Sequence, residues 1–229
     1  MKPSITSRHG IGGERAANFF HLRSLFLLIP VLFAGCGLFF GSSPPDEQYT
    51  LDYASPPFES LSRLSSSIRV DRFVTAEQFS NTTMISSPSQ NKRAVYNNAW
   101  WDVNPGEMIT DVLLRDIRNS GLYQATFSYR DDGEARFVLK GSVDEFLEVD
   151  SNEKAQAVLS LTVTLVDSAQ KIRTGSIVYQ KNYHATVPIA NRSPQALASG
   201  LSTTMAELSK QLQKDVYDAV RPLCNPAAP

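Results

Sequence analysis

Apolar residues recur at every second position in residues 155–167, and this alternation is typical of a strand with one buried face. The buried face would consist of Ala157, Leu159, Leu161, Val163 and Leu165. Similar runs, separated by short turns, cover residues 122–129, 135–149 and 175–189. Strands joined by short turns usually pair with their neighbours in sequence, so we expect these four to form an antiparallel meander.

The N-terminal half shows shorter and weaker strand patterns. Tyr49, Leu51 and Tyr53 alternate with polar residues, and residues 67–74 are rich in β-branched side chains. Two further short strands, 83–86 and 93–96, flank a polar turn rich in Ser, Pro and Asn.

Residues 104–121 carry the pattern of an amphipathic helix. Asn104 can cap the free amides of the first turn, Pro105 suits the first helical position, and Glu107 completes a capping box. Gly121 can take the left-handed conformation that ends many helices. The apolar face comprises Ile109, Val112, Leu113 and Ile117.

A second amphipathic helix is predicted over residues 193–220, with Ser193 as its cap, Pro194 at its start and Pro222 ending it. At about 27 residues it would be ~40 Å long. Its apolar stripe comprises Leu197, Leu201, Met205, Leu208, Leu212, Val216 and Val220. Strands with helices on one face make an α+β fold, so we predict one domain with a mostly antiparallel sheet and two helices packed on one of its faces.

The most apolar stretch of the chain, residues 25–41, lies ahead of these elements. The run from Leu25 to Phe40 would reach only ~24 Å as a helix, against ~30 Å of hydrocarbon, and Pro30 interrupts it. The basic residues Lys2, Arg8, Arg15 and Arg23 precede it. A basic region, an apolar segment and small residues form the pattern of a secretory signal.

A cysteine follows the small residues directly. The run Phe33-Ala34-Gly35-Cys36 resembles the bacterial lipobox, although Phe33 stands where that signal prefers Leu. The resemblance implies cleavage before Cys36, a diacylglyceryl group on its thiol and acylation, for example with palmitate, of the new amine. Two or three acyl chains give stable membrane anchoring. The alternative is a chance cysteine at the end of an ordinary signal or a short anchor.

These patterns divide the chain into four segments. Residues 1–35 are the expected signal peptide, 36–48 a lipidated flexible tether rich in Ser, Pro and acid, 49–222 the α+β domain, and 223–229 a C-terminal tail. Residues 1–35 carry a net charge of +3, so the remaining chain would have −4 from the −1 of the whole sequence. Neither value indicates a nucleic-acid surface, and we expect no nucleic-acid partner.

Few residues suggest chemistry. The two cysteines, Cys36 and Cys224, form no CxxC pair, and with Cys36 lipidated Cys224 has no intramolecular partner. No phosphate-binding glycine loop or calcium loop is apparent, so we expect no metal and no cofactor. His184 is the one histidine after residue 35, and no GxSxG motif accompanies it. We therefore expect a protein that is not an enzyme.

Four carboxylates cluster within one predicted strand: Asp144, Glu145, Glu148 and Asp150. General acid–base catalysis would need two of them to converge across a pocket with separated pKa values. The alternative, which we favour, is the solvated face of an edge strand, where charges deter further strand pairing.

The adjacent tryptophans Trp100 and Trp101 would point to opposite faces of a strand. One can enter the core, and the other would remain at the surface as a candidate contact for a partner or for lipid.

The order and spacing of these features resemble the ABC-type transport auxiliary lipoprotein family, whose members accompany MCE-type (mammalian cell entry-like) lipid transport systems. The resemblance covers about residues 36–221. It rests on Cys36-Gly37 followed by two prolines and "QYTLD" (48–52), on "SIRVDRF" (67–73), on the terminal helix, and above all on "YNNAWWDVNPGEMITDVLLRDIRNSGLY" (96–123). The double Trp and "SNTTMISSPSQ" (80–90) depart from the family pattern.

The resemblance implies a lipoprotein that works with an MCE-domain protein, a permease and an ATPase to move phospholipid or related lipids across a Gram-negative envelope. Gly37 is not the Asp that retains lipoproteins at the inner membrane, which implies outer-membrane attachment facing the periplasm. The oligomeric state stays open, with a homo-oligomer as one alternative. Another α+β envelope lipoprotein, acting in lipopolysaccharide or fibre export, and a periplasmic hydrolase are the competing hypotheses.

Overall fold

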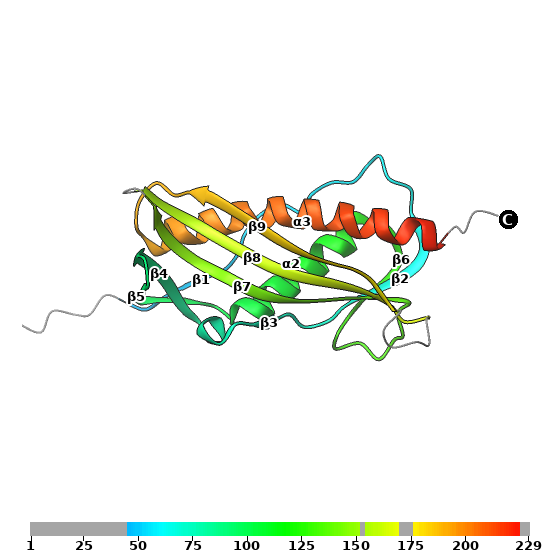
Figure 1. Ribbon diagram of the computed structural model, residues 1–229, viewed down its shortest axis with the longest axis horizontal. Helices are drawn as coiled ribbons and strands as arrows, with labels where there is room; N and C mark the ends of the chain where they lie inside the picture. The colour runs from blue at the N-terminus through cyan, green and yellow to red at the C-terminus, as the bar shows by residue number, and fades with distance from the viewer. Residues whose placement is uncertain (1–44, 152–153, 170–175, 225–229) are drawn as a thin grey trace, which may run out of the picture. The chain divides into compact units, whose positions relative to one another are not determined.

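The computed structural model describes residues 45–151, 154–169 and 176–224 (Figure 1). The strands are β1 Glu47–Tyr49, β2 Leu64–Val70, β3 Val74–Thr75, β4 Thr83–Ser89, β5 Lys92–Trp101, β6 Tyr123–Ser128, β7 Phe137–Ser151, β8 Lys154–Asp167 and β9 Ile177–Pro188. The helices are the 3-10 helix η1 Glu77–Phe79 and the α-helices α2 Pro105–Ser120 and α3 Pro194–Cys224. The α+β class is thereby confirmed.

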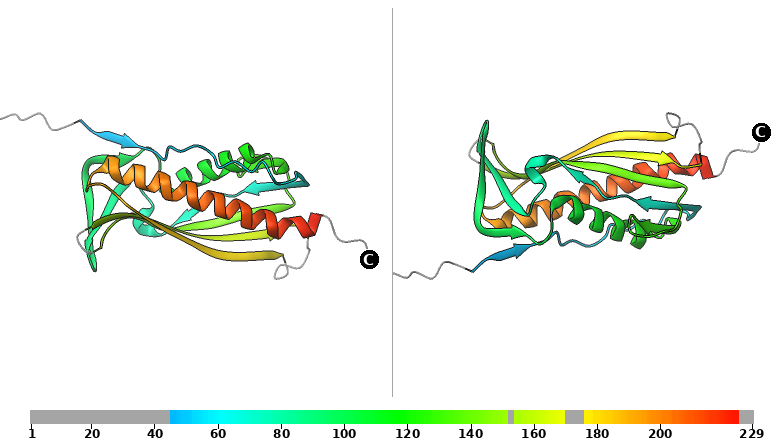
Figure 2. Two further views of the ribbon diagram at one scale, coloured as in Figure 1. Left: turned by 90° about the horizontal axis from the view of Figure 1, so that it is seen from above. Right: turned by 90° about the horizontal axis from the view of Figure 1, so that it is seen from below.

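The strands form one nine-stranded mixed sheet that curls into a half-barrel (Figure 2). The long strand β7 is at its centre. One edge of β7 pairs antiparallel with β8, and its other edge pairs in succession with β2, β3 and β4, all parallel. The expectation of a mostly antiparallel sheet is therefore wrong. The chain from β2 to β4 advances along β7 in three short steps, and such discontinuous parallel pairing leaves no turn signal in the sequence.

The predicted meander is right for three of its four strands. β7, β8 and β9 pair antiparallel in order. β6 pairs in parallel with β2 and not with β7. Eight residues separate β6 from β7, so no tight turn forces these two strands to become neighbours.

Helix α2 begins and ends where its sequence predicts. The Asn104 side chain accepts a hydrogen bond from the Glu107 amide at 3.1 Å and donates to the Glu107 carboxylate at 2.9 Å. Gly121 follows the helix with φ of 64°, a conformation that glycine adopts without steric cost. These caps set the two ends of the helix, which lies against β6 and β7.

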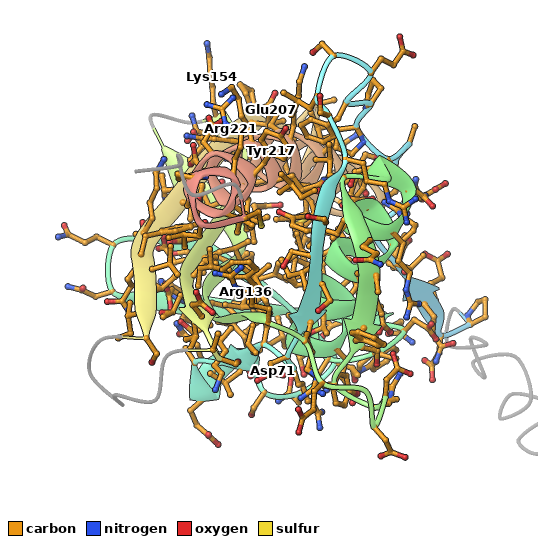
Figure 3. All side chains as sticks on the ribbon, turned by 90° about the vertical axis from the view of Figure 1, so that its right-hand side faces the viewer. Asp71, Arg136, Lys154, Glu207, Tyr217 and Arg221 are labelled. Carbon is orange, nitrogen blue, oxygen red and sulfur yellow. The ribbon has the colours of Figure 1, made fainter. Side chains whose placement is uncertain are left out.

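Helix α3 starts at Pro194, and the Ser193 hydroxyl accepts the Ala196 amide at 3.2 Å. The helix continues to Cys224, two residues past Pro222, where we expected it to end. Pro222 lies in the last turn, where its missing amide costs a single backbone hydrogen bond. Seen end-on, α3 lies between the wall formed by β8 and β9 and the strand β2 (Figure 3).

The core is continuous from the sheet to both helices. The Trp101 ring, 1% exposed, meets the Phe146 ring edge-on with centroids 4.9 Å apart. Gly141 on β7 makes room for Phe73, because a Cβ atom there would lie 2.3 Å from the Phe73 ring. Phe73 thus fixes the loop between β2 and β3 on the central strand.

Candidate functional site: a buried carboxylate that holds the N-terminal strap

An extended segment joins β1 to β2 and crosses α2 and α3. We call residues 50–62 the strap. Its start is fixed to α3 by the Asp52 amide, which donates to the Ser202 hydroxyl at 3.0 Å. Its end is fixed by Tyr217, labelled in Figure 3, whose hydroxyl donates to the Ser62 carbonyl at 2.9 Å. The strap is therefore held along α3 at both ends.

Asp116 on α2 fixes the middle of the strap, and its side chain is completely buried. Its Oδ2 accepts hydrogen bonds from Tyr53 Oη and Ser209 Oγ, both at 2.6 Å. Its Oδ1 accepts from Ser55 Oγ at 2.7 Å and from Arg115 Nη2 at 2.9 Å. One carboxylate thus joins the strap, α2 and α3, and we call these five residues the Asp116 clamp.

The electrostatics of the clamp favour a fixed, charged centre. The Arg115 guanidinium forms a salt bridge with Asp116 and also lies 4.5 Å from the centre of the Tyr53 ring. Burial, together with the hydrogen bond to Asp116, raises the pKa of Tyr53 well above its usual range. Tyr53 therefore remains a neutral donor, as a permanent bond to a carboxylate requires.

The clamp is suited to mechanical attachment. Donors occupy both oxygens of Asp116 and leave little room for a substrate atom.

Two shallow grooves adjoin the strap on α3: one of 430 Å³ beside Tyr53 and one of 530 Å³ beside Phe58. Lys210 and Lys214 line the second groove.

The predicted lipidation residues Cys36, Phe33, Ala34, Gly35 and Gly37 lie outside the described residues. The described residues begin next to β1, which pairs in parallel with β5. No helix in the described part of the chain is long and apolar enough to cross a bilayer.

The two tryptophans lie as the alternation predicts, on opposite faces of β5. Trp101 belongs to the core and offers no surface to a partner. Trp100 is half-buried and lines a 370 Å³ groove with Asp46 and Asp102. Trp101 also lines this groove but is only 1% exposed, so Trp100 is the better placed of the pair to contact lipid or a partner.

The four clustered carboxylates do not converge on a common point, because each has its own partners. Asp144 accepts hydrogen bonds from Ser142 and Thr162, and Glu145 lies 3.4 Å from His184. Asp150 forms an ion pair with Arg192 at 3.0 Å. Their strand, β7, is the centre of the sheet, so the interpretation as an edge strand is wrong. The charges are tolerated there because each is paired across or beside the strand.

Glu148 differs from the other three because it is 3% exposed. The Tyr96 hydroxyl on β5 donates to its carboxylate and so links the β4–β5 hairpin to the central strand. Burial raises the pKa of Glu148, and the hydrogen bond from Tyr96 opposes that rise. Burial and the bond to Glu148 also raise the pKa of Tyr96. Glu148 thus has a structural partner in Tyr96, and the neighbouring carboxylate of Asp150, which also raises the pKa of Glu148, is itself paired with Arg192.

Cys224 is half-buried at the end of α3. Among the described residues, no group of three or more His, Cys, Asp or Glu side chains is arranged to hold a metal ion.

Sequence reasoning did not identify the Asp116 clamp. Asp116 lies three residues after Leu113 and four after Val112, on the predicted apolar face of α2. Tyr53 ends the alternating run that we interpreted as a strand pattern, and Ser55 follows it, whereas the strand β1 ends at Tyr49. The one available signal was an acid on the buried side of an amphipathic helix, which requires a partner.

Comparison with known proteins agrees with this architecture. A Xanthomonas campestris protein of the DUF330 family superposes with a TM-score of 0.69 at 16% identity, over 76% of this chain and 97% of that one. An uncharacterized protein superposes with a TM-score of 0.60 at 11% identity, over 76% and 99%. At these identities the likeness concerns the fold alone. No curated protein matches the sequence.

The sequence model of the ABC-type transport auxiliary lipoprotein component matches residues 49–213. That span includes the whole strap, all of α2, most of α3 and all strands from β2 to β9. The chain therefore belongs to the ABC-type transport auxiliary lipoprotein family.

Proposed function

We propose that this protein is a lipid-anchored auxiliary component of an MCE-type ABC system that moves phospholipid or related lipids between the membranes of a Gram-negative envelope. The observation that carries the proposal is the family match over residues 49–213. Its role is non-enzymatic: the domain docks onto the transport machinery, and the ATPase supplies the energy elsewhere.

The lipobox and the strap support this role together. Acyl chains on Cys36 would hold the chain in the membrane, and the peptide from Cys36 leads directly into β1 and the strap. A pull on the anchor would act first on the pairing of β1 with β5 and would then reach α2 and α3 through the Asp52–Ser202 bond and the Asp116 clamp. The clamp would thereby let a flexible tether position a rigid domain. Gly37 after the lipidated residue supports attachment to the outer membrane, facing the periplasm.

The partners in this proposal are an MCE-domain protein and its permease and ATPase. The test is cross-linking in intact cells, followed by purification through a tag on the C-terminal end of the chain. We expect an MCE-domain protein among the cross-linked partners, and the Cys36→Ala variant should recover much less of it. Recovery of lipopolysaccharide or fibre export proteins in its place would favour the assembly-lipoprotein alternative and contradict the proposal.

A further inference from the structure

The β4–β5 hairpin has an outer face that combines apolar and basic side chains. Ile85 pairs with Val95 and Thr83 pairs with Trp100, so Val95 and Trp100 lie on one side of the hairpin. Arg93, two residues before Val95, shares that side. Positive φ at Asn98 and a register shift mark the bulge that returns Trp100 to this side. We call Arg93, Val95 and Trp100 the hairpin face; Ile85, which pairs with Val95, is itself only 7% exposed.

Val95 is unusually exposed for a large apolar side chain, with 58% of its surface accessible. Trp100, next along the face, is half-buried and borders the groove described above. Lys92 and Arg93 are exposed beside the turn of the hairpin. Nearby acids are Asp46, Glu47 and Asp102, all exposed. An indole and an aliphatic side chain with adjacent cations make up the surface that proteins present to the headgroup region of a bilayer.

The chain enters the domain beside this face. Gln48 on β1 pairs with Trp100 on β5, and the described residues begin only three residues earlier (Figure 1). Nine residues lead from Cys36 to Pro45, and even fully extended they span at most about 30 Å. Gln48, the partner of Trp100, is twelve residues from Cys36, so an anchor at Cys36 would keep Trp100 within about 40 Å of the bilayer.

The opposite end of the sheet is much further away. Glu148 pairs with Ser86 on the hairpin, whereas Phe137, eleven residues earlier on β7, pairs with Asp167 close to Ile177. At ~3.3 Å per residue this separates Ile177 from the hairpin by roughly 35 Å. The anchor therefore selects the hairpin end of the domain as the end nearest the membrane.

We propose that the hairpin face rests on the anchoring bilayer, with Trp100 and Val95 at headgroup level and Lys92 and Arg93 beside anionic phospholipid. This inference rests on the lipid anchor of the proposed function and adds to it a fixed orientation of the domain. The end of the sheet that carries Ile177 then lies away from the membrane, on the side of the transport machinery, and the strap leads from β1 toward that end.

The test uses the full-length lipidated protein reconstituted into vesicles of phosphatidylethanolamine and phosphatidylglycerol, with acyl chains brominated close to the headgroup. Bromine quenches only tryptophans that lie at the bilayer. We expect quenching of the tryptophan emission, and we expect it to be lost in Trp100→Phe, because Trp101 is enclosed in the core. Substituting Lys92 and Arg93 together by Gln should weaken the quenching in these vesicles and have little effect in vesicles without phosphatidylglycerol.

Val95→Glu should reduce the quenching strongly, because it places a carboxylate at the headgroup level. The matched control is Ile177→Glu, since Ile177 is 55% exposed but lies at the far end of the sheet. Equal thermal unfolding of the two variants would show that both are folded. Equal quenching in Val95→Glu, Ile177→Glu and the unsubstituted protein would overturn the inference, as would emission that the brominated lipids leave unchanged.

Flotation of the vesicles separates this inference from the proposed anchor. Protein that floats with the vesicles without quenching is anchored but does not rest on its hairpin face. Protein that does not float lacks the anchor, which contradicts both the lipidation and this inference.

Discussion

The Tyr53 hydroxyl donates a hydrogen bond of 2.6 Å to Oδ2 of Asp116, although 63 residues separate the two in the sequence. The bond links the strap to the middle of α2. Ser209 of α3 donates to the same oxygen. The strap is thus a fixed part of the domain.

Replacing Asp116 by Asn should destabilise the domain by about 2 kcal/mol, because an amide offers one acceptor oxygen to donors that now share two. Urea unfolding measures this loss. Proteolysis within residues 50–62 should accelerate as the strap loosens. Unchanged stability together with an unchanged cleavage rate would show that the clamp does not hold the strap.

Tyr53→Phe removes one donor and keeps the ring, so we expect a smaller loss of about 1 kcal/mol. In a double-mutant cycle with Asp116→Asn the two losses should not add, because both variants break the same bond. Tyr129→Phe is the control, since the half-buried Tyr129 stacks against Arg130 through its ring. Strict additivity of the first pair would argue against a direct Tyr53–Asp116 interaction.

Gly141→Ala should cost about 2 kcal/mol of unfolding free energy, because the new methyl group meets the Phe73 ring and the Thr162 carbonyl. Adding Phe73→Leu should recover part of this loss by removing the ring. If Gly141→Ala unfolds at the same urea concentration as the unsubstituted protein, Phe73 does not pack closely enough on Gly141 to exclude a methyl group.

The buried Glu148 should make the free energy of unfolding depend on pH. Burial raises its pKa in the folded state above the ordinary value of 4.5. The folded state therefore binds the proton more tightly than the unfolded state, and this contribution to stability is present below pH 4.5 and is lost as the pH rises through the folded pKa.

Glu148→Gln removes this titration and keeps an acceptor for Tyr96. Between pH 4.5 and 7, the free energy of unfolding of the unsubstituted protein should fall relative to that of the variant. Denaturant titrations at several pH values measure the difference. A difference that stays constant with pH, or that changes in the other direction, would show that Glu148 titrates normally.

Cys36→Ala tests the lipobox. The variant should accumulate as an uncleaved precursor or as protein that no longer takes up labelled palmitate, whereas Cys224→Ala should behave like the unsubstituted chain. Mass spectrometry of the N-terminal peptide shows which residue carries lipid. Normal processing and membrane fractionation of Cys36→Ala would rule out lipidation at that position.

Features with local causes were predictable from the sequence. The caps of α2, the opposite faces of Trp100 and Trp101 and the antiparallel order of β7, β8 and β9 follow from neighbouring residues or short turns. The end of α3 at Cys224 was not predictable from Pro222 alone, because a proline in the last helical turn disturbs only one hydrogen bond.

Features with long-range causes were not predictable. The parallel pairing of β2, β3 and β4 with β7 depends on where the chain returns after α2, and no short motif encodes that return. The Asp116 clamp joins residues 53, 116 and 209, whose proximity exists only in the folded chain. The strand that carries these carboxylates, β7, was interpreted as an edge strand because the sequence shows the charges but not the residues that pair with them.

The central claim is that this protein takes part in lipid transport. Its most direct test is the rate at which newly labelled phospholipid moves between the inner and outer membranes of cells that lack the chain, measured after membrane separation. We predict that the rate changes on deletion and is restored by the unsubstituted protein but not by Cys36→Ala. A rate that is the same with and without the protein would contradict the account.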